Sequence, residues 1–163
     1  MTEVAFSLGS NTGERLEFIH QMKSALSEIL SGPILASELM ETEPVGVNEE
    51  QPWYLNQIMC GLYDGDAEML LKKTLQIELD LGRIGKKMLA PRTADIDILL
   101  FGRQIVDTED LKIPHPAILK RKFCLYGLNR IVPQWIVPGV EMSVNSLYLR
   151  MESEVEAQKI RFL

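Results

Sequence analysis

The stretch Ala90-Pro91-Arg92-Thr93-Ala94-Asp95-Ile96-Asp97-Ile98-Leu99-Leu100-Phe101 decides how this chain is expected to fold. Its second half is a continuous apolar run, which is typical of a strand covered on both faces. Asp95 and Asp97 stand at the head of that strand, two residues apart. Because side chains alternate along a strand, both carboxylates are predicted to point to the same side.

Two close carboxylates repel each other, and in a folded protein such a pair usually needs a hard cation. Magnesium fits, since it accepts one or two carboxylates and keeps its other positions for water and phosphate oxygens. The alternative is a pair of exposed acids at a strand end, each in a surface ion pair. For Asp-x-Asp taken alone this alternative is the commoner one, so the magnesium hypothesis depends on the surrounding residues.

Composition indicates one ordinary globular domain, residues 1–163. The chain is 46% apolar and 25% charged, and no apolar run approaches the roughly 20 residues that span a bilayer. The start lacks a basic segment followed by an apolar one, so we expect no signal peptide and a cytoplasmic protein. Cys60 and Cys124 are predicted to be reduced core residues, because neither has a second metal-ligating residue at suitable spacing.

The net charge of −6 is unevenly distributed. Residues 82–130 carry ten Lys or Arg against five Asp or Glu, a net +5, and the rest of the chain carries −11. An acidic body with a local basic window favours a small anionic ligand over a nucleic-acid backbone. The alternative is that basic residues cluster here by chance.

Hydrophobic periodicity and turn residues predict the elements in order. They are strand 3–8, helix 14–30, strand 34–41, strand 53–63, helix 66–81 (with Asp66 as N-cap), the Asp95/Asp97 strand, a short strand 103–106, helix 117–130 and a terminal helix from 144. The order β-α-β-β-α-β predicts an α+β, ferredoxin-like antiparallel sheet with helices on one face and a C-terminal strand and helices appended. The first and last core strands are then antiparallel neighbours, so the turn Gly9-Ser10-Asn11 should face Asp95 and Asp97.

Basic residues surround the acidic pair in the predicted site. They are Arg92, the loop 83–87, His115, Lys120 and Arg121. Phosphoryl transfer needs this inventory, because it depends on charge neutralisation more than on covalent help. The chain has no Gly-x-x-x-x-Gly-Lys-Ser/Thr loop, so side chains must hold a nucleotide. His115 is as consistent with a helix cap or core residue as with a catalytic one.

The other half of the predicted site is apolar and amide-bearing, and much of it lies near the long loop 42–52. Its members are Thr42, Pro44, Val45, Tyr54, Asn56 and Phe123. A flat heterocycle could stack between Tyr54 and Phe123 and be read by the Asn56 amide. The alternative is that the two aromatic residues are ordinary core residues.

With these residues assembled, the chain resembles the 6-hydroxymethyl-7,8-dihydropterin pyrophosphokinase family of folate biosynthesis from about residue 6 to residue 133. The matching blocks are Phe6-Ser7-Leu8-Gly9-Ser10-Asn11, Glu41-Thr42-Glu43-Pro44-Val45-Gly46, Tyr54-Leu55-Asn56, Ile77-Glu78 with Gly82-Arg83, Pro91-Arg92-Thr93-Ala94-Asp95-Ile96-Asp97, Pro114-His115-Pro116 and Arg121-x-Phe123. The family has the ferredoxin-like fold that the element order predicts.

The resemblance implies a role for each matching residue. Asp95 and Asp97 would hold two magnesium ions, and these two with Arg83 and Arg92 would be catalytic. ATP would be bound by Arg83, Arg92, Ile98, Lys112, His115 and Arg121, and the pterin by Thr42, Pro44, Val45, Tyr54, Asn56 and Phe123. The hydroxymethyl oxygen would attack the β-phosphorus of ATP, and AMP would leave. The expected partners are ATP and the pterin, with no nucleic acid or membrane, and a monomer is favoured.

One block departs from the family pattern. Where the family carries a second arginine and an Arg-Trp pair, this chain has Gly85 and Met88-Leu89, and the neighbouring Lys86 and Lys87 lack the bidentate fork of arginine. The departure bears on the rate more than on the reaction. Two other functions stay open: a nucleotidyltransferase with the same Asp-x-Asp site, and a ferredoxin-like module that binds a small ligand without turnover.

Overall fold

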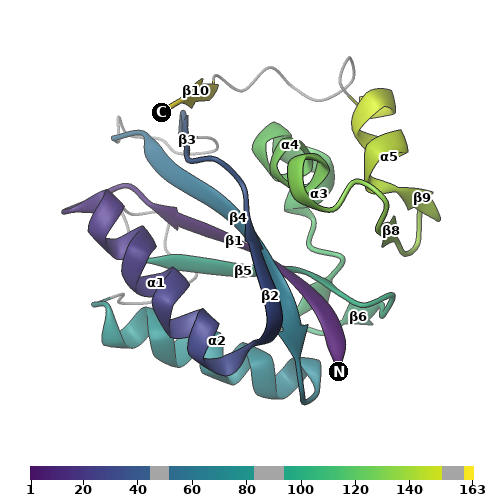
Figure 1. The fold of residues 1–163 in the computed structure, drawn as a ribbon, viewed down its shortest axis with the longest axis horizontal. Coiled ribbons are helices and arrows are strands. Elements are labelled where there is room, and N and C mark those ends of the chain that lie inside the picture. The colour runs from purple at the N-terminus through teal and green to yellow at the C-terminus, as the bar shows by residue number, and fades with distance from the viewer. Residues whose placement is uncertain (45–51, 83–93, 152–159) are drawn as a thin grey trace.

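The computed structural model describes residues 1–44, 52–82, 94–151 and 160–163. Within these ranges the main sheet has the strand order β10-β3-β4-β1-β5, and β2 also pairs with β4. Figure 1 shows this sheet at the centre of an α+β structure. Its strands are β1 (Thr2–Ser10), β2 (Ser31–Ala36), β3 (Met40–Thr42), β4 (Tyr54–Tyr63), β5 (Asp95–Phe101) and β10 (Ile160–Phe162).

Strand β1 lies between β4 and β5 and is antiparallel to both. Its pairing with β4 runs from Thr2 opposite Tyr63 to Ser10 opposite Leu55. On its other side, Gly9 is opposite Asp95, with one register shift between Ala5 and Phe6. The end of the first strand therefore faces the start of the Asp95/Asp97 strand, as the sequence predicts.

Helices α1 (Arg15–Ile29) and α2 (Ala67–Asp80) cover one face of the sheet (Figure 1). Asp66 caps α2 as predicted, accepting a hydrogen bond from the Met69 N–H at 2.8 Å. The predicted apolar face of α1 is wrong at Leu16, whose exposed fraction is 47%. A step of three residues is shorter than one helical turn of 3.6 residues, so residues placed repeatedly three apart move around the helix. Leu16 therefore lies off the apolar face, and Phe18 packs against the core instead.

The helices appended after β5 cover the opposite face, a placement that the sequence alone did not predict. They are α3 (Ala117–Lys120), α4 (Lys122–Ile131) and α5 (Val144–Met151). Helix α4 approaches β4 closely, because a Cβ on Gly127 would lie 2.2 Å from Ile58 Cγ1. The single helix predicted over 117–130 is wrong, since Arg121 has extended backbone (φ −117°, ψ 110°) and separates α3 from α4.

Two predicted strands also differ from the structure. The strand expected over 34–41 is divided into β2 and β3. Between them, the Ser37 N–H donates a hydrogen bond to the Ile58 carbonyl, and Ser37 Oγ accepts one from the Ile58 N–H. The strand expected over 103–106 lies later: it is β6 (Val106–Asp107), paired with β7 (Lys112–Ile113). A second small ribbon joins β8 (Ile136–Val137) to β9 (Met142–Ser143).

The core forms on both sides of the sheet. One apolar cluster lies under α1 and α2 and the other under α4 and α5. Cys60 and Cys124 are free and buried, as predicted. Among the described helices, none has the length and apolar character needed to cross a membrane.

Candidate active site

Asp95 and Asp97 begin β5 and are both half-buried, whereas Ile96 between them is buried. This alternation places the two carboxylates on the same side of the strand, as predicted. Asp95 is paired with Gly9 and Asp97 with Ser7 across the central ladder. The acids thus lie where the end of β1 meets the start of β5.

Glu78 of α2 holds the start of β5 from the face of the sheet that α1 and α2 cover. Its side chain is 2% exposed, and its Oε2 accepts a hydrogen bond at 2.7 Å from the backbone N–H of Ile96. Ile96 is the residue between the two aspartates, so this bond ties a buried carboxylate to the backbone that carries them. Sequence reasoning gave Glu78 no role, although its spacing from Leu70 and Thr74 places it on the buried face of α2.

His115 links the acidic pair to α3, one of the helices on the face of the sheet opposite α1 and α2. Its Nε2 lies 3.6 Å from Asp97 Oδ1, and its Nδ1 accepts a hydrogen bond from the Ala117 N–H at 3.0 Å. Since Nδ1 is an acceptor, the neutral ring carries its proton on Nε2, toward Asp97. The two interpretations of His115 are therefore compatible, because one nitrogen caps α3 and the other faces the site.

Cys124 and Arg121 lie at the start of α4, close to Asp97. Burial raises the pKa of the Cys124 thiol, and the negative charge of Asp97 raises it further. The positive charge of Arg121 and a hydrogen bond with Ser7 act in the opposite direction on this pKa. A raised pKa makes the thiol a poor nucleophile at neutral pH, and both Asp97 and Arg121 are near enough to act on that pKa.

A cavity of about 210 Å³ adjoins Asp97. Three of the residues expected to bind ATP, namely Ile98, Lys112 and His115, line this cavity together. Its other lining residues are Leu71, Ile96, Asp97, Glu109, Asp110, Leu111 and Pro116. Five lining residues are apolar, and the other five are three acids, Lys112 and His115. An apolar wall beside charged groups suits a flat ring with a charged substituent.

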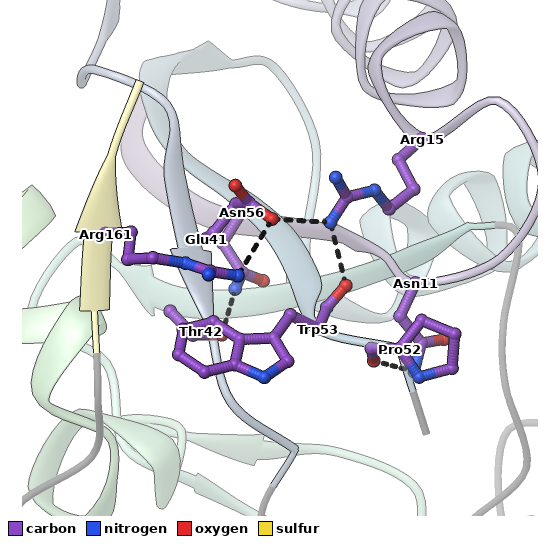
Figure 2. A network of polar contacts seen from close by, with 8 residues as sticks. All are labelled: Asn11, Arg15, Glu41, Thr42, Pro52, Trp53, Asn56 and Arg161. Atoms are coloured by element: carbon purple, nitrogen blue, oxygen red, sulfur yellow. Dashed lines mark hydrogen bonds and ion pairs between the residues drawn. The ribbon is translucent and has the colours of Figure 1, made fainter. Parts of the chain in front are cut away.

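Thr42 and Asn56 meet on the two neighbouring strands β3 and β4. They are 1% and 4% exposed, and Asn56 Nδ2 donates a hydrogen bond to Thr42 Oγ1 at 2.6 Å (Figure 2). Gly9 makes room for this pair, because a Cβ there would lie 2.9 Å from Asn56 Oδ1. Three strands thus bring together two residues of the predicted pterin half and the glycine opposite Asp95.

Some of the remaining predicted site residues lie in the ranges that the structure describes, and others lie outside them. Tyr54 begins β4 and Phe123 lies in the first turn of α4, both half-buried, and Pro44 follows β3. The stacking of a ring between Tyr54 and Phe123 stays a prediction. Outside the described residues lie Val45, Arg83, Gly85, Lys86, Lys87, Met88-Leu89 and Arg92.

A polar network beside Thr42 and Asn56 was missed by sequence reasoning (Figure 2). Glu41 Oε2 lies 3.1 Å from Arg15 Nη1 and 3.5 Å from Arg161 Nη2. The same Arg15 nitrogen donates to the Trp53 carbonyl at 2.9 Å, and Asn11 Nδ2 donates to the Pro52 carbonyl at 3.2 Å. These partners are 26 to 120 residues apart in the chain, so no local pattern indicates them.

Comparison with known proteins gives concordant matches. The model of the family described as 7,8-dihydro-6-hydroxymethylpterin-pyrophosphokinase (HPPK) matches residues 5–133. The chain is 38% identical over 136 residues to the 2-amino-4-hydroxy-6-hydroxymethyldihydropteridine pyrophosphokinase of Bacillus subtilis, covering 82% of this chain and 81% of that protein. It is 35% identical to the protein of the same name from Aquifex aeolicus, with 85% of each chain covered.

Solved structures agree on the fold. The chain of Plasmodium falciparum HPPK-DHPS superposes with a TM-score of 0.68 at 16% sequence identity, over 93% of this chain and 45% of that one. The present chain therefore spans less than half of that solved chain, and likewise 20% of the folic acid synthesis protein fol1 of Pneumocystis carinii, to which it is 34% identical. From the family match over residues 5–133 and the identity to relatives of similar length, the chain belongs to the 7,8-dihydro-6-hydroxymethylpterin-pyrophosphokinase family.

Proposed function

We propose that this enzyme transfers the pyrophosphoryl group of ATP, with magnesium, to the hydroxymethyl group of 6-hydroxymethyl-7,8-dihydropterin and releases AMP. The observation that carries the proposal is the position of Asp95 and Asp97, which lie between the cavity lined by His115 and the Gly9–Asn56 contact. A metal-binding pair thus separates a candidate nucleotide site from a candidate pterin site. Transfer between the two ligands requires that they meet at such a junction, with the reacting groups held close together.

The donor set fits magnesium. Asp95 and Asp97 are two hard oxygen donors on one side of a strand, and both are half-buried. They would hold the ions, two of which are expected from the family resemblance. When bound, magnesium would neutralise the phosphate oxygens of ATP.

The chain's own residues would orient and neutralise the two ligands. The base of ATP would occupy the cavity beside Ile98 and Lys112, and the Nε2–H of His115 and the guanidinium of Arg121 would face its phosphates. Arg83 and Arg92 would add permanent cations around the transferring group. The pterin hydroxymethyl oxygen forms a bond to the β-phosphorus as the bond from that phosphorus to the α,β-bridging oxygen breaks. AMP leaves with that oxygen and its electron pair, and the proton of the hydroxymethyl group is released to solvent.

The pterin ring would lie against the buried amide of Asn56. Because Asn56 Nδ2 is engaged by Thr42, its Oδ1 would accept from an N–H donor of the ring. The aromatic faces would come from Tyr54 and Phe123, and the loop residues Pro44 and Val45 complete the proposed pocket. Within this proposal, residues 1–163 act as one monomeric pyrophosphokinase domain with a ferredoxin-like βαββαβ core.

The test follows the products. The chain is incubated with magnesium, ATP and the hydroxymethyl pterin, and AMP is expected as the nucleotide product. Release of pyrophosphate in place of AMP would mean nucleotidyl transfer, the second candidate that Asp-x-Asp allows. Ligand binding without either product would mean a binding module.

The Asp97→Asn variant tests the metal site. We expect turnover to be abolished with no loss of thermal stability, because the amide cannot hold magnesium yet removes the repulsion with Asp95. Calorimetry of ATP binding with and without magnesium should show tight binding by the wild type only when magnesium is present. Asp64→Asn, in the exposed turn before α2, is the matched control. Turnover of Asp97→Asn within a few-fold of wild type would show that the metal assignment is wrong.

A further inference from the structure

The C-terminal strand β10 is the edge strand of the sheet on the side of the proposed pterin pocket. It pairs antiparallel with β3, with Ile160 opposite Thr42 and Arg161 opposite Glu41. Figure 1 shows the C-terminus beside β3 and away from α1 and α2. A residue of the C-terminal tail therefore lies next to the threonine that holds Asn56.

Apolar contacts fix β10 against the second face of the molecule. The ring of Phe162 lies 4.9 Å from that of Tyr126 in α4, and Ile160 packs on the apolar cluster under α4 and α5. Phe123, the proposed pterin-stacking residue, packs on the same cluster. Strand β10 thus bridges β3 and α4, two elements that carry proposed pterin ligands.

Arg161 reaches from β10 to the residues that precede β4. Its guanidinium carbon lies 3.7 Å from the centre of the Trp53 ring, and its Nη2 lies 3.5 Å from Glu41 Oε2 (Figure 2). Arg15 holds the Trp53 carbonyl from the other side. Trp53 is therefore fixed at its ring by Arg161 and at its backbone by Arg15, immediately before Tyr54.

We propose that β10 is a positioning element of the pterin site and that Arg161 is its positioning residue. Through the Trp53 ring and Glu41, Arg161 sets the position of Tyr54 and of the Thr42–Asn56 pair. The inference rests on the proposed function, because it assigns a role to these residues in pterin binding. The planar guanidinium is required for the stacking on indole, and lysine supplies only the charge.

The expected effect is on pterin recognition and not on global stability. The side chain of Arg161 is 57% exposed, so its ion pair with Glu41 contributes little to folding. An exposed cation–π contact corresponds to roughly a twofold to fivefold change in an equilibrium constant. Arg161→Ala should therefore raise the KM for the pterin by about this factor, while the KM for ATP, kcat and the melting temperature stay near the wild-type values.

The experiment compares Arg161→Ala, Arg161→Lys and Arg161→Glu in the full chain. The KM for the pterin should rise in the order Lys, Ala, Glu, because lysine keeps the attraction to Glu41 and glutamate reverses it. Arg150→Ala is the matched control, since Arg150 is an exposed arginine of α5 whose contact is with Met142. A second readout uses the Trp135→Phe background, where Trp53 is the remaining tryptophan. There Arg161→Ala should increase quenching of Trp53 fluorescence by acrylamide without any ligand.

The outcomes separate the inference from the proposed function. If the wild type releases AMP and the KM for the pterin is unchanged in Arg161→Ala and Arg161→Glu, the inference alone is overturned. If kcat falls equally in Arg161→Ala and Arg161→Glu while the KM values for the pterin and for ATP stay unchanged, Arg161 has a merely structural role. That result would also overturn the inference. If the wild type releases no AMP, the proposed function fails and the inference fails with it.

Discussion

Replacing Gly9 by alanine tests how the pterin half of the site is built. The added Cβ would lie 2.9 Å from Asn56 Oδ1 and 3.5 Å from Tyr54 Cδ1. Real Cβ atoms do not approach an oxygen so closely, so the Asn56 amide must move. It has little freedom, because it is 4% exposed and its Nδ2 is hydrogen-bonded to Thr42 Oγ1 at 2.6 Å.

The size of the effect follows from that hydrogen bond. If the amide turns away, a buried donor loses its partner, which costs about 1–3 kcal/mol. That cost falls on the folding stability. The pterin would lose its proposed acceptor, Asn56 Oδ1, a hydrogen bond of similar size, so its binding should weaken by roughly fivefold to 150-fold. ATP binding should change far less, because the nucleotide is proposed to lie in the cavity beside Ile98 and His115.

The assay is steady-state AMP release with the pterin concentration varied, together with a thermal melt. Gly61→Ala is the matched control. It lies on β4 opposite Val4, and the atoms nearest to its Cβ would be in the flexible side chains of Leu30 and Ile34, at 3.0 and 3.1 Å. Both variants should lose some stability, but only Gly9→Ala should raise the KM for the pterin. If Gly9→Ala keeps the wild-type KM for the pterin, the reasoning on Asn56 is refuted.

Three further predictions concern stacking, packing and pH. Phe123→Ala should weaken pterin binding roughly tenfold to hundredfold in calorimetry and ATP binding much less, because a stacked ring contributes about 1–3 kcal/mol; equal losses would make Phe123 a packing residue. Gly127→Ala should destabilise the fold by about 1–3 kcal/mol or more and lower Tm by roughly 2–12 °C, since its Cβ would lie 2.2 Å from Ile58 Cγ1; an unchanged Tm would contradict that contact. Burial raises the pKa of the Cys60 and Cys124 thiols above the ordinary thiol value of 9.0. The stability from their protonated forms is therefore present below pH 9 and is lost as pH rises further, by up to about 1.4 kcal/mol per pH unit for each thiol. Denaturant unfolding at pH 8 and pH 10 measures this loss, and a double Cys→Ser variant should lack it.

The sequence alone determined the features that depend on neighbouring residues. The alternation at Asp95 and Asp97 predicts two carboxylates on one side of a strand, and Asp66 predicts the N-terminus of α2; both hold in the structure. The order of elements predicts that Gly9 faces Asp95, because a β-α-β-β-α-β chain has few ways to pair its first and last strands. These features are recorded in local periodicity and in element order.

Local patterns failed where a distant segment decides the conformation. Residues 34–41 have the composition of one strand, but the bonds of Ser37 to Ile58 interrupt the pairing. Arg121 lies within a helical pattern, yet extended backbone there divides α3 from α4. In both places, packing on β4 and β5 overrides the propensity of the segment, which is worth less than 1 kcal/mol per residue.

The tertiary structure alone decided how the two halves of the site are held. The contact of Gly127 with Ile58 sets the distance of α4 from the sheet, and through it the position of Phe123. The three-residue strand β10 is too short for any periodicity to reveal, and its Arg161 meets Trp53 because β10 pairs with β3. Pairing between distant segments depends on which strand edges remain exposed in the folded core. A short stretch of sequence does not contain that information.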